Sequence, residues 1–321
     1  MNIIFTFKPP IEMQKELQQS FPDIRFHYFN QIEEGQSIWG EAEVIVTFGE
    51  DLTPQHINNA HHLKWIMVVS AGLEKMPLDS IQEQQIMVTN ARGIHKKPMA
   101  EFTFAYILHH AKGIHNLSLL QNQRVWNHTL KTQEINEQCI MIVGTGAIGQ
   151  EIARISQAFG MKVIGVNRSG KMVDHVDEVI QLDSLKEALP EADYIVSILP
   201  STKETVHIYQ YEHFQKMKES AVFINIGRGD VVEESVLIDA LLNQEIAHAY
   251  LDVFKKEPLP ADHPFWNMKN LTITPHLSSH SEHYLPRAMA IFKENLSSYL
   301  QKEDKQQYIN VVDIAYCQNF I

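Results

Sequence analysis

One arginine, Arg228, stands between two glycines at the end of an apolar run in the stretch FINIGRGDVV. Arginine is costly to bury without a partner and usually lies on a protein surface. A guanidinium at the end of a buried strand therefore calls for an ionic partner or an anionic ligand. The flanking glycines, Gly227 and Gly229, would let ligands come close to the strand end. The pattern indicates a functional position, with a structural salt bridge as the alternative.

A second pattern, GxGxxG, is formed by Gly144, Gly146 and Gly149 in QCIMIVGTGAIGQEIARISQAFG. It follows an apolar strand and opens an amphipathic helix, the context in which this spacing indicates a dinucleotide site. The first glycine allows a tight turn, the second lets backbone amides approach a pyrophosphate, and the third lets helix and strand pack closely. Ala147 and Ile148 complete the predicted phosphate loop. A tight turn without a ligand is the alternative.

The residues expected to contact the ribose of the dinucleotide are Asn167, Arg168 and Ser169, at the end of the next strand. This position, about 20 residues after the glycine loop, normally carries Asp or Glu in NAD-binding proteins. Here no carboxylate is present to repel a 2′-phosphate, while a guanidinium and a hydroxyl are present to bind one. The sequence therefore favours NADP(H) as the cofactor, with NAD(H) as the alternative. An ordinary surface arginine is the structural alternative for Arg168.

The elements that must position these residues alternate between strand and helix almost throughout the chain. Strand-like apolar runs are NIIFTF, IRFHYF, EVIVTF, KWIMVVSAG and IMVTNA, followed later by CIMIVG, KVIGV, YIVSIL, AVFINIG, AYLDVF and LTITPH. Such alternation is typical of parallel sheets covered by helices. Pro98 suits the first turn of a helix that we expect to run to about Trp126. A last helix is predicted from about Tyr284 to Leu300.

The composition is that of an ordinary globular protein, and 321 residues are enough for about two domains. The net charge of −12 gives the chain no electrostatic reason to bind nucleic acid or an anionic membrane. No apolar run is long enough to span a bilayer, and the N-terminal MNIIFTFKPP resembles a strand more than a signal sequence. The two cysteines, Cys139 and Cys317, form no CxxC pair, which fits a reducing compartment. We expect a soluble cytoplasmic protein.

Five motifs occur in a fixed order along the chain: GTGAIG, SILPSTKET, FINIGRGDVVEE, LDVFKKEPLP and ITPHLSSH. In this order they resemble the D-isomer-specific 2-hydroxyacid dehydrogenases, a family that includes glyoxylate/hydroxypyruvate reductases and phosphoglycerate dehydrogenases. The resemblance covers nearly the whole chain. It implies an α/β fold of two Rossmann-like or flavodoxin-like parallel-sheet domains with a cleft between them. We expect residues 1–98 and 285–321 to form the substrate domain and residues 99–284 the dinucleotide-binding domain.

The resemblance also assigns chemistry to three residues. Arg228 would bind the carboxylate and the carbonyl of a 2-oxo acid. His276, in TPHLSSH, would be the acid/base, and Glu257, in KKEPLP, would be its carboxylate partner. The chemistry agrees, because hydride delivery to a ketone carbon builds negative charge on oxygen, and a histidine can supply the proton near neutral pH. A salt bridge, a solvated loop acid and a strand-end polar group are the respective structural alternatives.

Further matches concern the two ligands. The cofactor would contact Leu199, Pro200, Thr205 and Ile226, with Asp252 of YLDVF on the nicotinamide carboxamide. In VVSAGLEKMP, the backbone amides of Ala71 and Gly72 would hold the substrate carboxylate. Glu74 of this loop stands where the family often has Asp. Each of these residues has a plainer interpretation as part of a turn, a strand end or a charged surface.

Two other groups of residues are expected to be ordinary. His276, His280 and His283 lie close together in the sequence, but no Asp, Glu or Cys completes a recognisable ligand set, so no metal site is predicted. Lys96 and Lys97, near the domain junction, are interpreted as solvated, with a more anionic substrate as the alternative.

The predicted function is hydride transfer between NAD(P)H and a small 2-oxo acid to give a D-2-hydroxy acid, with glyoxylate and hydroxypyruvate as the first candidates. A phosphoglycerate-type dehydrogenase is weakened as an alternative, because 321 residues leave no room for the regulatory domain that many of them carry. The resemblance also implies a homodimer, with the helix after Pro98 contributing contacts. A dinucleotide-sensing binding protein of the same fold is the alternative from another class. Turnover distinguishes the two, since a sensor would bind dinucleotide tightly and reduce 2-oxo acids poorly.

Overall fold

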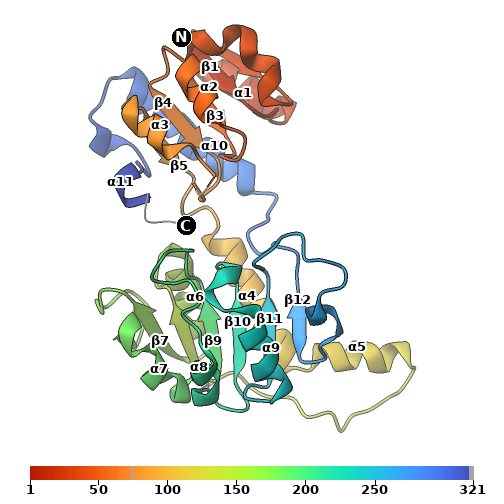
Figure 1. Cartoon of the computed structure of the whole chain (residues 1–321). Helices are drawn as coiled ribbons and strands as arrows, with labels where there is room; N and C mark the ends of the chain where they lie inside the picture. The colour runs from red at the N-terminus through yellow and green to blue at the C-terminus, as the bar shows by residue number, and fades with distance from the viewer. Residues whose placement is uncertain (74, 318–321) are drawn as a thin grey trace. The chain divides into compact units, whose positions relative to one another are not determined.

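The chain folds as two compact units (Figure 1). The computed structural model describes residues 1–73 and 75–317, so Glu74 lies outside the described residues. Unit 1 comprises Met1–Ile94 and the segment that begins at Ser281, and unit 2 comprises His95–His280. The boundaries expected from the sequence, after residues 98 and 284, fall a few residues later in the chain.

Unit 1 is built around a parallel sheet of five strands in the order β2-β1-β3-β4-β5. The strands are β1 (Asn2–Phe5), β2 (Arg25–Tyr28), β3 (Ala42–Thr47), β4 (Trp65–Val68) and β5 (Met87–Asn90). The helices are α1 (Ile11–Ser20), α2 (Pro54–Asn59), α3 (Leu78–Glu83), α10 (Tyr284–Leu300) and α11 (Ile314–Cys317), with 3-10 turns η1 (Ile32–Glu41) and η6 (Lys305–Gln307). Each strand overlaps an apolar run expected from the sequence, although the run KWIMVVSAG continues four residues beyond the end of β4.

Both faces of this sheet are buried, because successive side chains of a strand point to opposite sides. Ile57 of α2 and Ile81 of α3 belong to the hydrophobic layer on one face. Helices α1 and α10 cover the other face. There Phe292 of α10 packs edge-on against Phe5 with ring centroids 5.5 Å apart, and it stacks on Trp65 at 5.6 Å. A helix from the far end of the sequence therefore completes the core of the first unit.

The segment after α10 runs back to β5. The amide of Asn90 donates to the carbonyl of Asn310 at 3.2 Å, and the amide of Val312 donates to Val88 at 2.9 Å. An antiparallel bridge joins Thr89 and Val311. The backbone groups at the outer side of β5 are therefore paired with the late part of the chain, which protects this sheet edge from other strands.

Unit 2 is built around a parallel sheet of seven strands in the order β12-β11-β10-β9-β6-β7-β8. The strands are β6 (Cys139–Val143), β7 (Lys162–Asn167), β8 (Glu178–Gln181), β9 (Tyr194–Ser197), β10 (Val222–Asn225), β11 (His248–Leu251) and β12 (Leu271–Ile273). The helices are α4 (Lys96–Ala111), α5 (Ile114–Asn122), α6 (Ala147–Ala158), α7 (Leu185–Ala188), α8 (Tyr211–Lys216) and α9 (Glu234–Leu242), with 3-10 turns η2 (Leu182–Ser184), η3 (Leu189–Glu191), η4 (Gly229–Val231) and η5 (Pro264–Asn267). Helices α4 and α6 contribute to the apolar layer on one face, and α7, α8 and α9 to the layer on the other.

Unit 2 departs from the sequence analysis in two places. The helix expected to run from Pro98 to about Trp126 is two helices, because α4 ends at Ala111 and Gly113 adopts a left-handed φ of 61° before α5 begins. Glycine takes this conformation without the cost that a side chain would add. Strand β8 was not expected at all. It lies at the sheet edge with no fully buried residue, so its sequence EVIQ gives no apolar run to detect.

The strand order of unit 2 reverses beside β6. The chain passes from β6 to β7 and β8 on one side and then returns to β9 on the other side of β6. In open parallel sheets, ligands bind outside the carboxyl ends of the strands at such a reversal. All strand pairs of unit 2 are parallel, so the segments that follow them emerge at one edge of the sheet.

Candidate active site

The glycine loop follows β6 at this reversal, and each glycine meets a different requirement. Gly144 has a φ of 110°, and a Cβ there would lie 2.9 Å from the carbonyl oxygen of Ile198. A Cβ on Gly149 would lie 2.2 Å from the carbonyl oxygen of Gly144, so helix α6 can approach the loop only without a side chain. A Cβ on Gly146 would meet nothing within 4 Å. The loop therefore has an open, exposed centre at the helix N-terminus, which fits a pyrophosphate.

Ala147 and Ile148 form the first turn of α6 directly after this opening, where backbone N–H groups have no partner inside the helix. Such groups, together with the helix dipole, favour an anion. Ala147 is exposed and Ile148 is half-buried. The small side chain of Ala147 leaves these amides accessible.

The predicted ribose-contacting residues form a tight turn at the end of β7. The Asn167 side-chain amide donates to Thr145 Oγ1 and to the carbonyl oxygen of Lys171, both at 3.0 Å. Ser169 Oγ donates to Asn167 Oδ1 at 3.1 Å, which ties the turn together. Arg168 reaches out of this turn, and its Nη2 lies 2.8 Å from Glu204 Oε2. Sequence reasoning missed Glu204, although it stands in the SILPSTKET motif.

The loop after β9 contains Leu199, Pro200 and Thr205, and its polar side chains mainly hold the loop itself. Thr205 is buried, and its Oγ1 donates to the carbonyl oxygen of Pro200 at 2.5 Å. The same Oγ1 accepts the amide N–H of Thr202 at 2.9 Å. Leu199 is buried under the loop. The structure thus gives Thr205 an internal structural role in addition to its predicted place beside the cofactor.

Arg228 follows β10, and the reason for its flanking glycines lies within the protein. A Cβ on Gly227 would lie 2.6 Å from the carbonyl oxygen of Leu199, and one on Gly229 would lie 2.1 Å from the carbonyl carbon of Phe254. Neighbouring backbone, rather than a ligand, already excludes side chains at both positions. Arg228 Nη1 donates to the carbonyl oxygen of Gly227 at 2.9 Å.

Asn225 shapes the loop that carries Arg228, and sequence reasoning missed it. Its Oδ1 accepts the amide N–H of Gly227 at 3.1 Å, and its Nδ2 donates to the carbonyl oxygen of Arg228 at 2.9 Å. Asn225 is 1% exposed, so these bonds satisfy a buried amide. The available signal was an amide at the end of an otherwise apolar strand. Ile226 beside it is buried, and its N–H donates to Ser197 at 3.1 Å.

His276 and Glu257 form an ion-pair geometry after β12 and β11. His276 Nδ1 lies 2.8 Å from Glu257 Oε2. The other carboxylate oxygen, Oε1, accepts the amide N–H of Phe254 at 2.9 Å, which fixes the carboxylate. The His276 side chain is 46% exposed and that of Glu257 36% exposed. Since Nδ1 is engaged by Glu257, Nε2 is the ring nitrogen that remains for the predicted proton transfer.

Asp252 anchors the segment that carries His276. It is fully buried, and its carboxylate accepts from Thr274 Oγ1 at 2.5 Å and from the amides of Leu277 and Ser278, both at 2.9 Å. His276 itself has a φ of 53°, and its N–H donates to the carbonyl oxygen of Asp252 at 2.9 Å. Four hydrogen bonds to one residue therefore hold the histidine in a strained backbone conformation.

The Asp252 anchor extends to helix α4. Tyr106 Oη lies 2.5 Å from Thr274 Oγ1. Thr274 donates its own proton to Asp252, so Tyr106 is the donor in this contact. Burial raises the pKa of Tyr106, which keeps the phenol protonated. Sequence reasoning did not single out Tyr106, because it lies in an apolar helical stretch far from the motifs.

The predicted substrate loop lies in unit 1, between β4 and α3. Ala71 and Gly72 are half-buried, and the carbonyl oxygen of Ala71 accepts from the Asn90 side chain at 3.1 Å. Ser70 Oγ donates to Phe48 at 3.0 Å and has a second contact with the carbonyl oxygen of Gly72 at 3.2 Å. Carbonyl groups of this loop are thus engaged by neighbouring side chains. Glu74 of the same loop is outside the described residues.

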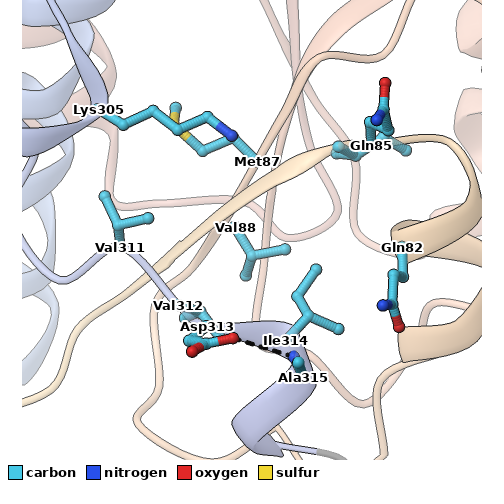
Figure 2. A pocket seen from close by; sticks show the side chains of 11 residues that line it. Gln82, Gln85, Met87, Val88, Lys305, Val311, Val312, Asp313, Ile314 and Ala315 are labelled. Carbon is cyan, nitrogen blue, oxygen red and sulfur yellow. Dashed lines mark hydrogen bonds between the residues drawn. The ribbon is translucent and has the colours of Figure 1, made fainter.

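Unit 1 also contains a pocket (Figure 2). Its apolar lining includes Met87, Val88, Val311 and Ile314, between β5 and the returning chain. It contains none of the predicted site residues, and Asp313 in its wall accepts the amide N–H of Ala315 at 3.1 Å. The pocket lacks the arginine and histidine on which the predicted chemistry depends.

Within residues 1–73 and 75–317, no three His, Cys, Asp or Glu side chains gather in a way that could hold a metal ion. In the same part of the chain, no helix combines the length and the apolar character needed to cross a bilayer. Lys96 and Lys97 are exposed at the start of α4.

A parallel sheet whose strand order reverses beside a glycine loop is typical of nucleotide-dependent dehydrogenases. Residues 104–278 match the description "D-isomer specific 2-hydroxyacid dehydrogenase, NAD binding domain". The chain is 30% identical over 287 residues to glyoxylate/hydroxypyruvate reductase B of Escherichia coli, covering 87% of this chain and 88% of the relative. The chain belongs to the D-isomer specific 2-hydroxyacid dehydrogenase family, whose members are oxidoreductases that act on CH–OH groups with NAD(P).

Solved structures agree with this assignment. A D-isomer specific 2-hydroxyacid dehydrogenase family protein from Aeromonas salmonicida has a TM-score of 0.88 at 32% identity, covering 98% of this chain and 99% of that one. A D-isomer specific 2-hydroxyacid dehydrogenase from Xanthobacter autotrophicus, solved with NADPH and MES, has a TM-score of 0.80 at 26% identity, with 98% of each chain covered. The α/β fold with two parallel sheets and the family predicted from the sequence are therefore confirmed.

Proposed function

We propose that this protein reduces a small 2-oxo acid to the D-2-hydroxy acid with NADPH, and catalyses the reverse oxidation. The observation that carries the proposal is the 2.8 Å pair of His276 Nδ1 and Glu257 Oε2 at the sheet edge where Arg228 also emerges. Arg228 follows β10, Glu257 follows β11 and His276 follows β12, and these strands are neighbours. A proton donor and a carboxylate-binding fork at one edge are the groups that a 2-oxo acid needs.

The nicotinamide, when bound, would supply the hydride. The side chains of this chain bind the substrate, stabilise the developing charge and transfer the proton. Arg228 binds the substrate carboxylate and stabilises the negative charge that develops on the carbonyl oxygen. His276 gives that oxygen a proton from Nε2, and Glu257 holds the ring and stabilises its charged form. In the oxidation, Nε2 takes the hydroxyl proton back. Asp252 holds the backbone of His276, and it is also our candidate for the nicotinamide carboxamide.

The proposed substrates are small 2-oxo acids. We propose glyoxylate or hydroxypyruvate as substrates, supported by the 30% identity to glyoxylate/hydroxypyruvate reductase B. In unit 1, the amides of Ala71 and Gly72 are our candidates for holding the substrate carboxylate, which makes unit 1 the substrate domain and unit 2 the dinucleotide domain. A phosphoglycerate-type dehydrogenase and a dinucleotide sensor remain the alternatives to be tested.

NADPH is proposed as the preferred cofactor. The turn after β7 carries Asn167, Arg168 and Ser169 and no carboxylate, so a 2′-phosphate meets a guanidinium there. The relative from Xanthobacter autotrophicus was solved with NADPH. Leu199, Pro200, Thr205 and Ile226 are proposed to line the same cofactor.

A homodimer in the cytoplasm is also proposed. Helix α5 contains no buried residue in this chain, and it exposes Ile114, Leu117 and Leu119 by 43%, 40% and 45%. Trp126, in the connection after α5, is 94% exposed. Exposed apolar side chains gathered on one element are typical of a surface that is covered in the assembly.

Loss of reduced-nicotinamide absorbance with the purified protein tests the proposal. Glyoxylate, hydroxypyruvate, pyruvate and longer 2-oxo acids are each offered with NADPH and with NADH. We expect turnover of the small acids with NADPH favoured. Clear dinucleotide binding without turnover of any acid would contradict the proposed dehydrogenase activity. It would support the alternative of a dinucleotide-sensing binding protein. Light scattering of the same sample measures the mass, and a monomer would contradict the dimer alone.

A further inference from the structure

We propose that Glu204 limits the preference for NADPH by competing with the 2′-phosphate for Arg168. This inference rests on the proposed dinucleotide-dependent function and adds a residue that sets cofactor choice. Arg168 Nη2 lies 2.8 Å from Glu204 Oε2, so the guanidinium proposed to bind the phosphate already has an anionic partner. A phosphate can use Arg168 fully only if this contact is broken or shared.

Each partner of the ion pair is held by its own turn. On the side of Glu204, Thr205 is 4% exposed, and its Oγ1 donates to the carbonyl oxygen of Pro200 and accepts the amide of Thr202. These bonds fix the backbone on which Glu204 stands. The pair therefore does not depend on a flexible loop that happens to carry an acid.

On the side of Arg168, the turn is fixed by its neighbours. The Asn167 amide binds both Thr145 and Lys171 at 3.0 Å, and Ser169 Oγ donates to Asn167. Thr145 belongs to the glycine loop, so the position of Arg168 is coupled to the loop proposed to bind the pyrophosphate. Two turns of defined geometry thus bring the acid and the base together beside the dinucleotide site.

The charges decide which cofactor is affected. A 2′-phosphate carries between one and two negative charges at neutral pH, so it is attracted by Arg168 and repelled by Glu204. NAD has a hydroxyl at this position and leaves the ion pair intact. Both side chains are more than 60% exposed, at 61% and 62%, so solvent and salt weaken these forces without abolishing them. Glu204 therefore lowers the affinity for NADP and not that for NAD.

The change Glu204→Gln removes the charge and keeps the shape. Titration calorimetry with NADP⁺ and with NAD⁺ measures the two dissociation constants directly, without turnover. We expect NADP⁺ to bind about 2- to 5-fold tighter and NAD⁺ to change by less than about twofold. The gain should shrink when salt is raised from low to high ionic strength, because it is electrostatic.

The matched control lies at the other end of the same strand. Glu191 Oε2 pairs with Lys162 Nζ at 2.8 Å, and Lys162 is the first residue of β7. Glu191→Gln removes the same charge from another half-exposed pair, at 47% and 51%, on the edge opposite the glycine loop. It should leave the affinities for NADP⁺ and NAD⁺ unchanged. An equal gain in both variants would mean that net charge alone acts, which would overturn the inference.

A double-mutant cycle tests whether Glu204 acts through Arg168. In Arg168→Gln protein, the further change Glu204→Gln should give clearly less gain for NADP⁺ than it gives in the natural protein. The same gain in both backgrounds would overturn the competition. No change in the ratio of NADP⁺ to NAD⁺ affinity on Glu204→Gln would overturn it as well.

The outcomes separate this inference from the proposed function. Natural protein that binds neither dinucleotide would reject both. Natural protein that binds dinucleotide and reduces a 2-oxo acid, with no effect of Glu204→Gln, would reject the inference alone. Natural protein that prefers NAD⁺ but moves towards NADP⁺ in the variant would support the role of Glu204 and correct the cofactor preference.

Discussion

Two histidines on neighbouring strands of unit 2, His248 and His276, show how the surroundings decide what a residue can do. His248 begins β11, where its Nε2 lies 2.9 Å from Thr272 Oγ1 and its ring lies 5.6 Å from that of His110. Burial, followed by the nearby His110 and His109, lowers the pKa of His248 to about 4. His276 follows β12, is half exposed and faces a carboxylate. The amino edge of the sheet therefore keeps a histidine neutral, while the carboxyl edge holds the half-exposed histidine that we propose for proton transfer.

The largest expected effect is that of His276→Ala. Loss of a general acid typically costs about 10²- to 10⁴-fold in rate, and we expect kcat to fall by this amount. The dissociation constant for the dinucleotide should stay within about twofold, because the glycine loop lies on other strands. Steady-state kinetics and calorimetry measure the two quantities. His280→Ala, at an exposed position nearby, is the control and should leave both unchanged. Equal loss of binding and turnover in His276→Ala would remove the support for the proton donor.

The other histidine should affect stability and its dependence on pH. The folded-state pKa of His248 lies below its unfolded value, so the unfolded chain binds more protons between about pH 6.5 and 4. Stability should therefore fall as the pH drops through this window, by on the order of 3 kcal/mol at most for this residue. Urea unfolding at several pH values measures the slope. His248→Gln should flatten it, and an unchanged slope would show that other groups carry the dependence.

Arg228→Lys tests whether Arg228, at the carboxyl edge of the sheet, binds the carboxylate of the substrate. Lysine keeps the charge but loses the planar fork, so we expect KM for the 2-oxo acid to rise by about 10- to 100-fold. Affinity for the dinucleotide should change little. Substrate titrations at saturating NADPH give KM, and a KM equal to that of the natural protein would count against Arg228 as the carboxylate anchor.

The smallest expected effect concerns the support beneath His276. Tyr106→Phe removes the hydrogen bond from Tyr106 to Thr274, the residue that donates to Asp252. We expect this loss to lower the free energy of unfolding by about 1 kcal/mol. We expect kcat to fall several-fold while KM for the acid stays the same, because the histidine loses its fixed position. Phe104→Leu is the control, because Phe104 lies on the same helix and stacks on Phe159 instead of contacting Thr274. A loss of stability in Tyr106→Phe with unchanged kcat would make Tyr106 a purely structural residue.

Much of the fold could be predicted from the sequence, because strand periodicity and glycine spacing are local signals. The strand runs and the last helix from Tyr284 to Leu300 coincide with the observed elements. The break at Gly113 was missed although a glycine is a local signal, because the apolar pattern continues on both sides of it. The edge strand β8 was missed because EVIQ has no apolar run. At the site, the motifs identified the individual residues that we propose for catalysis and binding. They could not predict the Arg168–Glu204 pair or the Tyr106 contact, which join segments that are distant in sequence.

The late arrival of α10 has a consequence for how the protein is made. Unit 1 needs Phe292 against Phe5 and Trp65, yet the ribosome synthesises all of unit 2 between them. At about 5–20 residues per second, the first sheet waits on the order of 10–40 s before α10 can join α1 on the second face. Unit 2 is continuous and can fold during this interval. The nascent chain is therefore most exposed to aggregation through its oldest residues, and chaperones would have to protect the beginning of the chain until its end has emerged.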